Sequence, residues 1–312
     1  MITLRYHVVS IASVFLALAL GVVLGSSAVG GRLLSGLAGD RDALGRQVAD
    51  LEAERNALNA QLDAADRFGT AVGPAAVRGL LDKRTVVLVS TVDASPSDRD
   101  ALVGLVRTAG ATVTGELQLT DTFTDPDKAD QLRQLVTRLL PAGARLPTAS
   151  DPGTLAGGLV GPLVLLNKDN NQPQAKPEEA AAALRALADG GFAKIAGDLR
   201  PAQLAVVLTG GRTSGDAAGD RAATVARFAT QLDRSGAGAV LAGRSGSADG
   251  VGPVGVVRAD TAASSVLSSV DNVDTAAGRV VAVLALRQEL EGRSGRYGTA
   301  GNAQGPAPEP AG

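Results

Sequence analysis

Two glycine-rich segments carry the residues best suited to binding a ligand. Gly210, Gly211 and Arg212 follow one β-branched run, and Gly243 and Arg244 follow another. Backbone N–H groups exposed by glycine, with a guanidinium nearby, can hold an anion at the carboxyl end of a strand. Neither segment has the G-x-G-x-x-G spacing of a dinucleotide site, so ordinary turn chemistry is the simpler interpretation. These five residues are our candidate ligand loops.

Imidazole and sulfur are missing from nearly the whole chain. There is no Cys, His7 is the only histidine and Met1 is the only methionine. Catalysis by Ser-His-Asp, Cys-His or zinc-bound water needs at least one of these groups. Asp93 and Asp121 follow predicted strands, where we interpret them as loop charges and helix caps. The sequence therefore predicts no enzyme, no catalytic residue, no bound cofactor and no metal site.

Composition excludes one large class of partner. The 312 residues carry 30 Lys and Arg against 32 Asp and Glu, a formal net charge of −2. The two signs are interspersed, so no basic surface is expected that would bind nucleic acid.

The elements that position these residues alternate between strand and helix patterns. This alternation is typical of a mostly parallel sheet with helices on both faces, so we predict an α/β domain with a Rossmann-like sheet. Prolines and acids mark helix starts at residues 95–98, 125–127 and 177–179. The gap between Ala242 and Val254 is too short for a helical crossover, which predicts an antiparallel or irregular element there. The predicted strands are residues 85–90, 111–119, 163–166, 204–209, 239–242, 254–257 and 280–286.

An uncharged apolar run occupies residues 8–31. A helix of about 20 residues crosses a hydrocarbon core of about 30 Å, so we predict a membrane anchor in residues 1–31 with a transmembrane helix at about 8–29. A cleaved signal peptide is the alternative, because Arg5 precedes the run and small residues follow it. The run exceeds the usual signal-peptide core of about 7–15 residues, which favours the retained anchor. We place the N-terminus in the cytoplasm and the soluble domain outside it.

A leucine heptad follows the apolar run. Its apolar seam comprises Leu34, Leu37, Leu44, Val48, Leu51, Leu58 and Leu62. We predict a coiled-coil helix over residues 32–68 that forms a homo-oligomer or pairs with a helix of another protein. Arg41 and Arg55 occupy the remaining seam positions and weaken the association. The alternative is an amphipathic helix packed on its own domain. Gly69, Gly73 and Pro74 are expected to end the helix.

The end of the chain is rich in Gly, Ser, Arg and Pro. Because it carries little apolar surface, we predict a disordered tail over residues 291–312. The extracytoplasmic α/β domain is then confined to residues 84–290, which is enough for a sizeable core.

Several stretches are similar to one known family. The first comprises Leu4, Arg5, His7, Val9 and Ser10, followed by VFLALA at 14–19 and GVVLGS at 21–26. Later ones are VARFA at 225–229, LAGRSGS at 241–247, VDNVD at 270–274, GRV at 278–280 and YGT at 297–299. The chain thereby resembles the actinobacterial copper transport protein B family, MctB, over nearly its whole length.

The resemblance implies an envelope protein of a high-GC actinobacterium, linked to copper efflux and copper homeostasis and described as an outer-membrane channel. Relatives in corynebacteria are linked to late cell separation, as the membrane partner of a second division protein. The resemblance thus implies that the coiled-coil partner is a protein of the envelope or division machinery. The alternative function is therefore a non-enzymatic coiled-coil scaffold or regulator of late cell division and envelope remodelling. A solute-binding domain is a third hypothesis, supported by the glycine-rich strand ends alone.

The residues fit a channel poorly. A transmembrane barrel needs many alternating segments of about ten residues and aromatic girdles, whereas this chain has five Phe, two Tyr and no Trp. Copper(I) prefers sulfur or imidazole ligands, and copper(II) also prefers nitrogen. No Cys, Met or His side chain follows His7. We therefore expect a membrane-anchored protein whose soluble domain does not itself hold copper.

Overall fold

The computed structural model describes residues 4–140 and 146–309, with only the backbone of residues 26–40 and 42. The chain divides into two compact units, Met1–Ala65 and Asp66–Gly312, which we describe separately. The helical elements are α1 (Leu4–Val77), α2 (Pro96–Thr108), α3 (Asp121–Thr124), η1 (Pro126–Lys128), α4 (Ala129–Arg138), α5 (Pro152–Val164), α6 (Pro177–Asp189), α7 (Ala218–Asp233), α8 (Pro253–Ala259), α9 (Thr261–Ser264) and α10 (Ala276–Glu289). The strands are β1 (Thr85–Thr91), β2 (Thr112–Leu119), β3 (Ala193–Ala196), β4 (Leu204–Thr209), β5 (Ala239–Gly243), β6 (Ser268–Val270) and β7 (Arg296–Tyr297).

The first unit consists of helix α1 up to Ala65. Its segment Leu4–Gly25 is long and apolar enough to cross a membrane, and the described residues contain one such segment. This segment begins four residues before the predicted start at residue 8. The side chains of residues 26–29, the predicted end of the span, lie outside the described part.

The predicted seam lies on α1. Leu44, Val48, Leu51, Leu58 and Leu62 are all exposed, between 52% and 68% of their surface. Leu34 and Leu37 fall in the segment where only the backbone is described. Whether a second helix covers this apolar stripe remains a prediction.

Helix α1 extends beyond residue 68, where the glycines predicted that it would end. It continues through Gly69, Gly73 and Pro74 to Val77. A Cβ atom on Gly73 would lie 2.8 Å from Cγ2 of Val280 in α10. The carboxylate of Asp66 accepts a hydrogen bond of 2.5 Å from the N–H of Ala276, at the start of α10. The glycines therefore allow two helices to approach closely instead of breaking one, and Asp66 places negative charge at a helix N-terminus.

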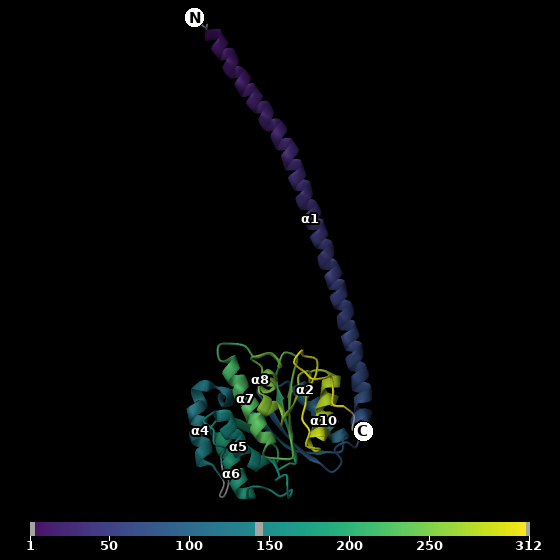
Figure 1. The fold of residues 1–312 in the computed structure, drawn as a ribbon, viewed down its shortest axis with the longest axis vertical. Helices are drawn as coiled ribbons and strands as arrows, with labels where there is room; N and C mark the ends of the chain where they lie inside the picture. The colour runs from purple at the N-terminus through teal and green to yellow at the C-terminus, as the bar shows by residue number, and fades with distance from the viewer. Residues whose placement is uncertain (1–3, 141–145, 310–312) are drawn as a thin grey trace. The chain divides into compact units, whose positions relative to one another are not determined.

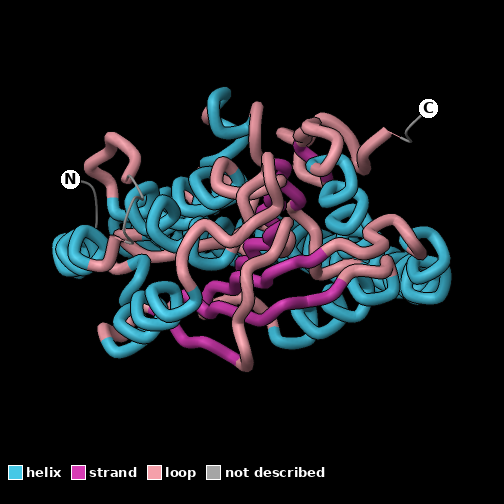
Figure 2. Tube along the Cα trace, turned by 90° about the horizontal axis from the view of Figure 1, so that it is seen from below, coloured by secondary structure: helices cyan, strands magenta, loops and turns pink. Residues whose placement is uncertain are grey.

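The second unit is a mixed α/β domain built on a seven-stranded sheet of order β3-β2-β1-β4-β5-β6-β7. All neighbours are parallel except β2 and β3, which are antiparallel at one edge. Helices cover both faces of the sheet (Figures 1 and 2). This arrangement confirms the predicted α/β class and the mostly parallel sheet.

Two apolar cores lie on opposite faces of the sheet. Val87 and Val89 of β1 belong to the core formed with α4, α5, α6, α7 and α8. Val86 and Leu88 alternate with them and belong to the core formed with α2, α10 and the end of α1. Side chains of a strand alternate between faces, so a strand buried on both faces is apolar at successive positions.

Strand predictions succeeded where the apolar run was short and uninterrupted. Residues 85–90, 112–119, 204–209 and 239–242 lie in β1, β2, β4 and β5, so the prediction for β2 began one residue early. Two other predictions are wrong, because residues 254–257 and 280–286 lie in α8 and α10. The prediction over residues 163–166 is wrong in its first half, which ends α5, whereas Leu165 and Leu166 form isolated β-bridges. These helices are buried on most sides, and periodicity alone does not separate a buried helix from a buried strand.

The expected irregular element between Ala242 and Val254 is also wrong. Because residues 254–257 are helical, α8 and α9 form an ordinary crossover from β5 to the parallel strand β6. The missed strands β3, β6 and β7 have four, three and two residues, too short for a periodicity to show.

The C-terminal segment differs from the predicted disordered tail. Residues 296–297 form β7, and Tyr297 is buried. A buried ion pair holds this segment: Nη1 of Arg258 lies 2.6 Å from Oδ2 of Asp271, and both side chains are at most 2% exposed. Arg258 also donates to the carbonyl of Tyr297 at 2.7 Å, and Asp271 accepts from the N–H of Thr299 at 2.8 Å. The domain therefore extends past residue 290, while residues 310–312 lie outside the described part.

Two buried carboxyl groups satisfy the N–H groups at the amino ends of neighbouring strands. Asp233 accepts from the N–H of Ala239 at 2.7 Å, and Glu289 accepts from the N–H of Ser268 at 2.8 Å. Burial raises the pKa of Asp233 to about 7. Burial, followed by the charge of Asp233, raises the pKa of Glu289 to about 8. Folding therefore favours the protonated form of both groups.

We predict that Gly73→Ala destabilises the full-length protein by about 1–2 kcal/mol, because the added methyl group overpacks against Val280. Val280→Ala in the same chain should recover most of this loss. Gly104→Ala is the matched control, since nothing lies within 4 Å of a Cβ atom at that position of α2. Urea unfolding measures all four proteins. Equal stabilities for Gly73→Ala and the wild type would contradict the close helix packing.

The raised pKa values predict that stability falls as the pH rises. Both carboxyl groups bind protons more tightly in the folded than in the unfolded chain. Their contribution to the free energy of unfolding is therefore complete below about pH 4 and is lost between about pH 4 and 8. Asp233→Asn keeps the acceptor for Ala239 without the charge, and should gain about 1–2 kcal/mol at pH 8 over the wild type. Thermal unfolding between pH 5 and 8 checks this, with exposed Asp216→Asn as control. An unchanged pH slope in Asp233→Asn would contradict it.

Candidate functional site

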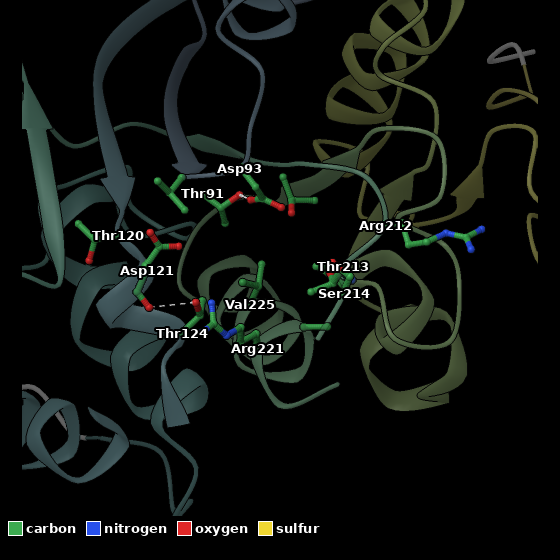
Figure 3. Close-up of a pocket in the computed structure, with 14 residues that line it drawn as sticks. Thr91, Asp93, Thr120, Asp121, Thr124, Arg212, Thr213, Ser214, Arg221 and Val225 are labelled. Carbon is green, nitrogen blue, oxygen red and sulfur yellow. Dashed lines mark hydrogen bonds between the residues drawn. The ribbon is translucent and has the colours of Figure 1, made fainter. Parts of the chain in front are cut away.

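The strand order places a cavity where the direction of the sheet connections reverses. From β1 the chain proceeds to β2 on one side, and from β4 it proceeds to β5 and β6 on the other. Ligands of open α/β sheets bind in the crevice outside the carboxyl ends of the strands at such a point. A cavity of about 230 Å³ lies at this position (Figure 3). Its lining comes from the segments after β1, β2 and β4 and from α7 and α8.

Charged groups of both signs line the cavity. Asp93 follows β1, Asp121 begins α3, and Arg221 stands in the first turns of α7. Asp93 accepts a hydrogen bond from the hydroxyl of Thr91. Within the described residues, neither Asp121 nor Arg221 forms an ion pair. The cavity therefore presents carboxylates and a guanidinium that are available to a ligand.

Hydroxyl groups supply most of the remaining polar lining. They belong to Thr91, Thr120, Thr124, Thr209, Thr213 and Ser214. Thr209 is only 1% exposed, and its hydroxyl has no hydrogen bond to any part of the chain that the structure describes. An unpaired hydroxyl at this depth can hydrogen-bond to a ligand or a water molecule in the cavity.

The predicted ligand loops lie beside the cavity and contact each other. The N–H of Arg244 donates to the carbonyl of Gly210 at 3.1 Å. A Cβ atom on Gly211 would lie 2.7 Å from the carbonyl oxygen of Ser245, so only glycine fits there. Gly243 is the last residue of β5. The glycines thus allow the two loops to pack together at the carboxyl ends of β4 and β5.

The two predicted arginines have partners within the protein. Arg212 lines the cavity, but its guanidinium lies 2.8 Å from the carboxylate of Asp249 and points away from the other lining side chains (Figure 3). Nε of Arg244 lies 3.4 Å from Oδ2 of Asp98, and Nη1 of Arg279 lies 3.7 Å from Oδ1. Burial raises the pKa of Asp98, although both arginines act to lower it.

Sequence reasoning named Asp93, Asp121 and the strand end at Thr209 without connecting them, and it missed Arg221. The sequence did contain a signal for Arg221. In residues 204–221 a strand is followed by a glycine-rich loop and then by a helix, and this order brings the first turns of the helix to the end of the strand. The partners of Arg212 and Arg244 come from distant segments, and no local pattern reveals them.

The side chains of the second unit are poorly suited to binding copper. No cluster of three or more His, Cys, Asp or Glu side chains suited to a metal ion occurs in the described ranges 4–140 and 146–309. The second unit contains neither His, Cys nor Met, the side chains that bind copper well. Its residues therefore do not fit copper as a tightly bound ion.

Comparisons with known proteins agree over nearly the whole chain. A family described as "Copper transport outer membrane protein, MctB" matches residues 1–308. The "Copper transporter MctB" of Mycobacterium tuberculosis (strain ATCC 25618 / H37Rv) is 41% identical over 304 residues, which is 96% of each chain. The protein of the same name from Mycobacterium leprae (strain TN) is 40% identical over 306 residues, again 96% of each chain. The resemblance seen in the sequence is thereby confirmed, and the chain belongs to the MctB family.

Proposed function

We propose that this protein acts in copper homeostasis as a non-enzymatic, membrane-attached protein of the cell envelope. The observation that carries the proposal is the family match over residues 1–308, with relatives called copper transporters at 40–41% identity. The apolar segment Leu4–Gly25 supports attachment to a membrane.

We further propose that the anchor is retained, with the N-terminus in the cytoplasm and a Rossmann-like domain outside it. Helix α1 is continuous from Leu4 to Val77. The apolar segment Leu4–Gly25 has 22 residues, more than the usual signal-peptide core of about 7–15, which supports a transmembrane anchor over a signal peptide. The reversal of strand order between β1 and β4 supports the Rossmann-like description.

The effect on copper is indirect in this proposal. Carboxylates, amides and hydroxyls remain as donors in the second unit, and they compete poorly with the sulfur and imidazole ligands of other copper proteins. The protein would then alter copper content through envelope permeability or through a partner that carries such ligands.

A scaffold role in late cell division and envelope remodelling is the second candidate, and the exposed seam favours it. Leu44, Leu51 and Leu58 recur every seven residues and are exposed. A homo-oligomeric coiled coil, or a pair with an envelope partner, would cover them. Arg55 at the seam limits the strength of the association.

Deletion of the gene distinguishes the two candidates. We predict that the deletion strain grown with added copper holds severalfold more copper per cell than its parent, and that the full-length chain restores the parental level. Elemental analysis of washed cells and microscopy of septa are made on the same cultures. Unchanged copper with altered septation would contradict the copper role and favour the scaffold.

Purified protein tests the indirect mechanism. Tag-free full-length protein, loaded with copper and desalted, should retain well below one equivalent of copper. A retained stoichiometric ion would contradict the indirect mechanism while leaving the copper role intact.

A further inference from the structure

We propose that the cavity at the ends of β1, β2 and β4 binds a small zwitterion of the amino-acid class. The carboxylate of the ligand would pair with Arg221, and its ammonium group with Asp121 and Asp93. This binding activity is separate from the copper role and does not depend on it.

The charges of the cavity carry the proposal. Asp121 and Arg221 line the same cavity of about 230 Å³, yet they form no ion pair with each other or with any other described residue. Arg212, by contrast, is neutralised by Asp249 at 2.8 Å. A group of each sign is thus left facing one space, and a ligand carrying both opposite charges satisfies them together.

Other ligand classes satisfy only part of this lining. An inorganic anion would pair with Arg221 but would face the carboxylates of Asp93 and Asp121. A metal cation would pair with Asp93 and Asp121, but Arg221 would repel it. A neutral sugar would hydrogen-bond to these groups but would neutralise none of the three charges. The zwitterion is the class whose charge pattern matches both sides of the cavity.

The depth and size of the cavity fit a small ligand with a polar side chain. Thr209 lines its inner part, is 1% exposed, and has no hydrogen-bond partner in the described structure. Val225 adds an apolar surface. Pockets for drug-sized molecules measure about 300–1,000 Å³, so a cavity of about 230 Å³ suits a single amino acid better than a peptide.

The packing of two helices fixes the opposite charges in place. Phe123 of α3 and Phe228 of α7 are buried and form an edge-to-face contact, with ring centroids 5.4 Å apart. Asp121 lies two residues before Phe123, and Arg221 lies two turns before Phe228 on the same helix. A site fixed before the ligand arrives loses less conformational entropy on binding.

Calorimetry on the full-length protein in detergent tests the proposal with serine as the probe. We expect L- or D-serine to bind with a dissociation constant below about 1 mM. N-acetylserine, which lacks the ammonium group, and serinamide, which lacks the carboxylate, should each bind at least tenfold more weakly. Binding of inorganic phosphate without binding of serine would overturn the proposal, as would equal binding of serine and its two blocked forms.

Single-residue variants test whether serine binds in this cavity. Arg221→Gln and Asp121→Asn should each weaken serine binding at least tenfold while their circular dichroism spectra remain those of the folded protein. Arg227→Gln, an exposed arginine on the same helix, and Asp127→Asn, in the neighbouring η1, are the matched controls and should bind as the wild type does. Equal binding by all five proteins would overturn the assignment of the cavity.

Discussion

Burial of the central strands on both faces is the constraint on which the domain depends. Every residue of β4 and β5 is buried, as is every residue of β1 except Thr85, which is half-buried. Such strands leave no face for polar side chains, so charge must collect at the strand ends. Asp233 and Glu289 serve the amino ends, and the cavity and the ion pair of Asp271 lie at the carboxyl ends.

The same constraint separates the stabilising charges from those available to a ligand. Arg258 and Asp271 are fully buried and bind each other and the backbone of the C-terminal segment. Removing one partner of such a pair would leave a buried charge, which is strongly destabilising. Asp121 and Arg221 lie nearer the surface and have no such partner in the described chain. Charged side chains of the same type thus have different roles here. Those that are buried beside a partner of opposite charge stabilise the fold, and those that lie near the surface without such a partner face a ligand.

The sequence predicted most of the central sheet but only part of the site. β1 and β4 were recognisable because each is a short apolar run between turn residues. The Val-rich residues 280–286 of α10 have the same composition, and only tertiary packing makes them helical. Gly73 suggested a helix end because a close approach to Val280 cannot be read from one segment. Arg221 was missed for a related reason. The sequence does not show that Asp249 pairs with Arg212, which leaves Arg221 as the arginine that faces the cavity without an ion pair in the described chain.

The proposed function requires that a member of the MctB family act on copper without strong copper ligands of its own. His7 is the only imidazole in the chain, and there is no Cys. The most direct measurement is the copper content of the deletion strain that expresses His7→Gln at the wild-type level in its membranes. The account predicts the parental copper content. A copper content as high as in the uncomplemented strain would contradict it, because the function would then depend on a copper-binding side chain.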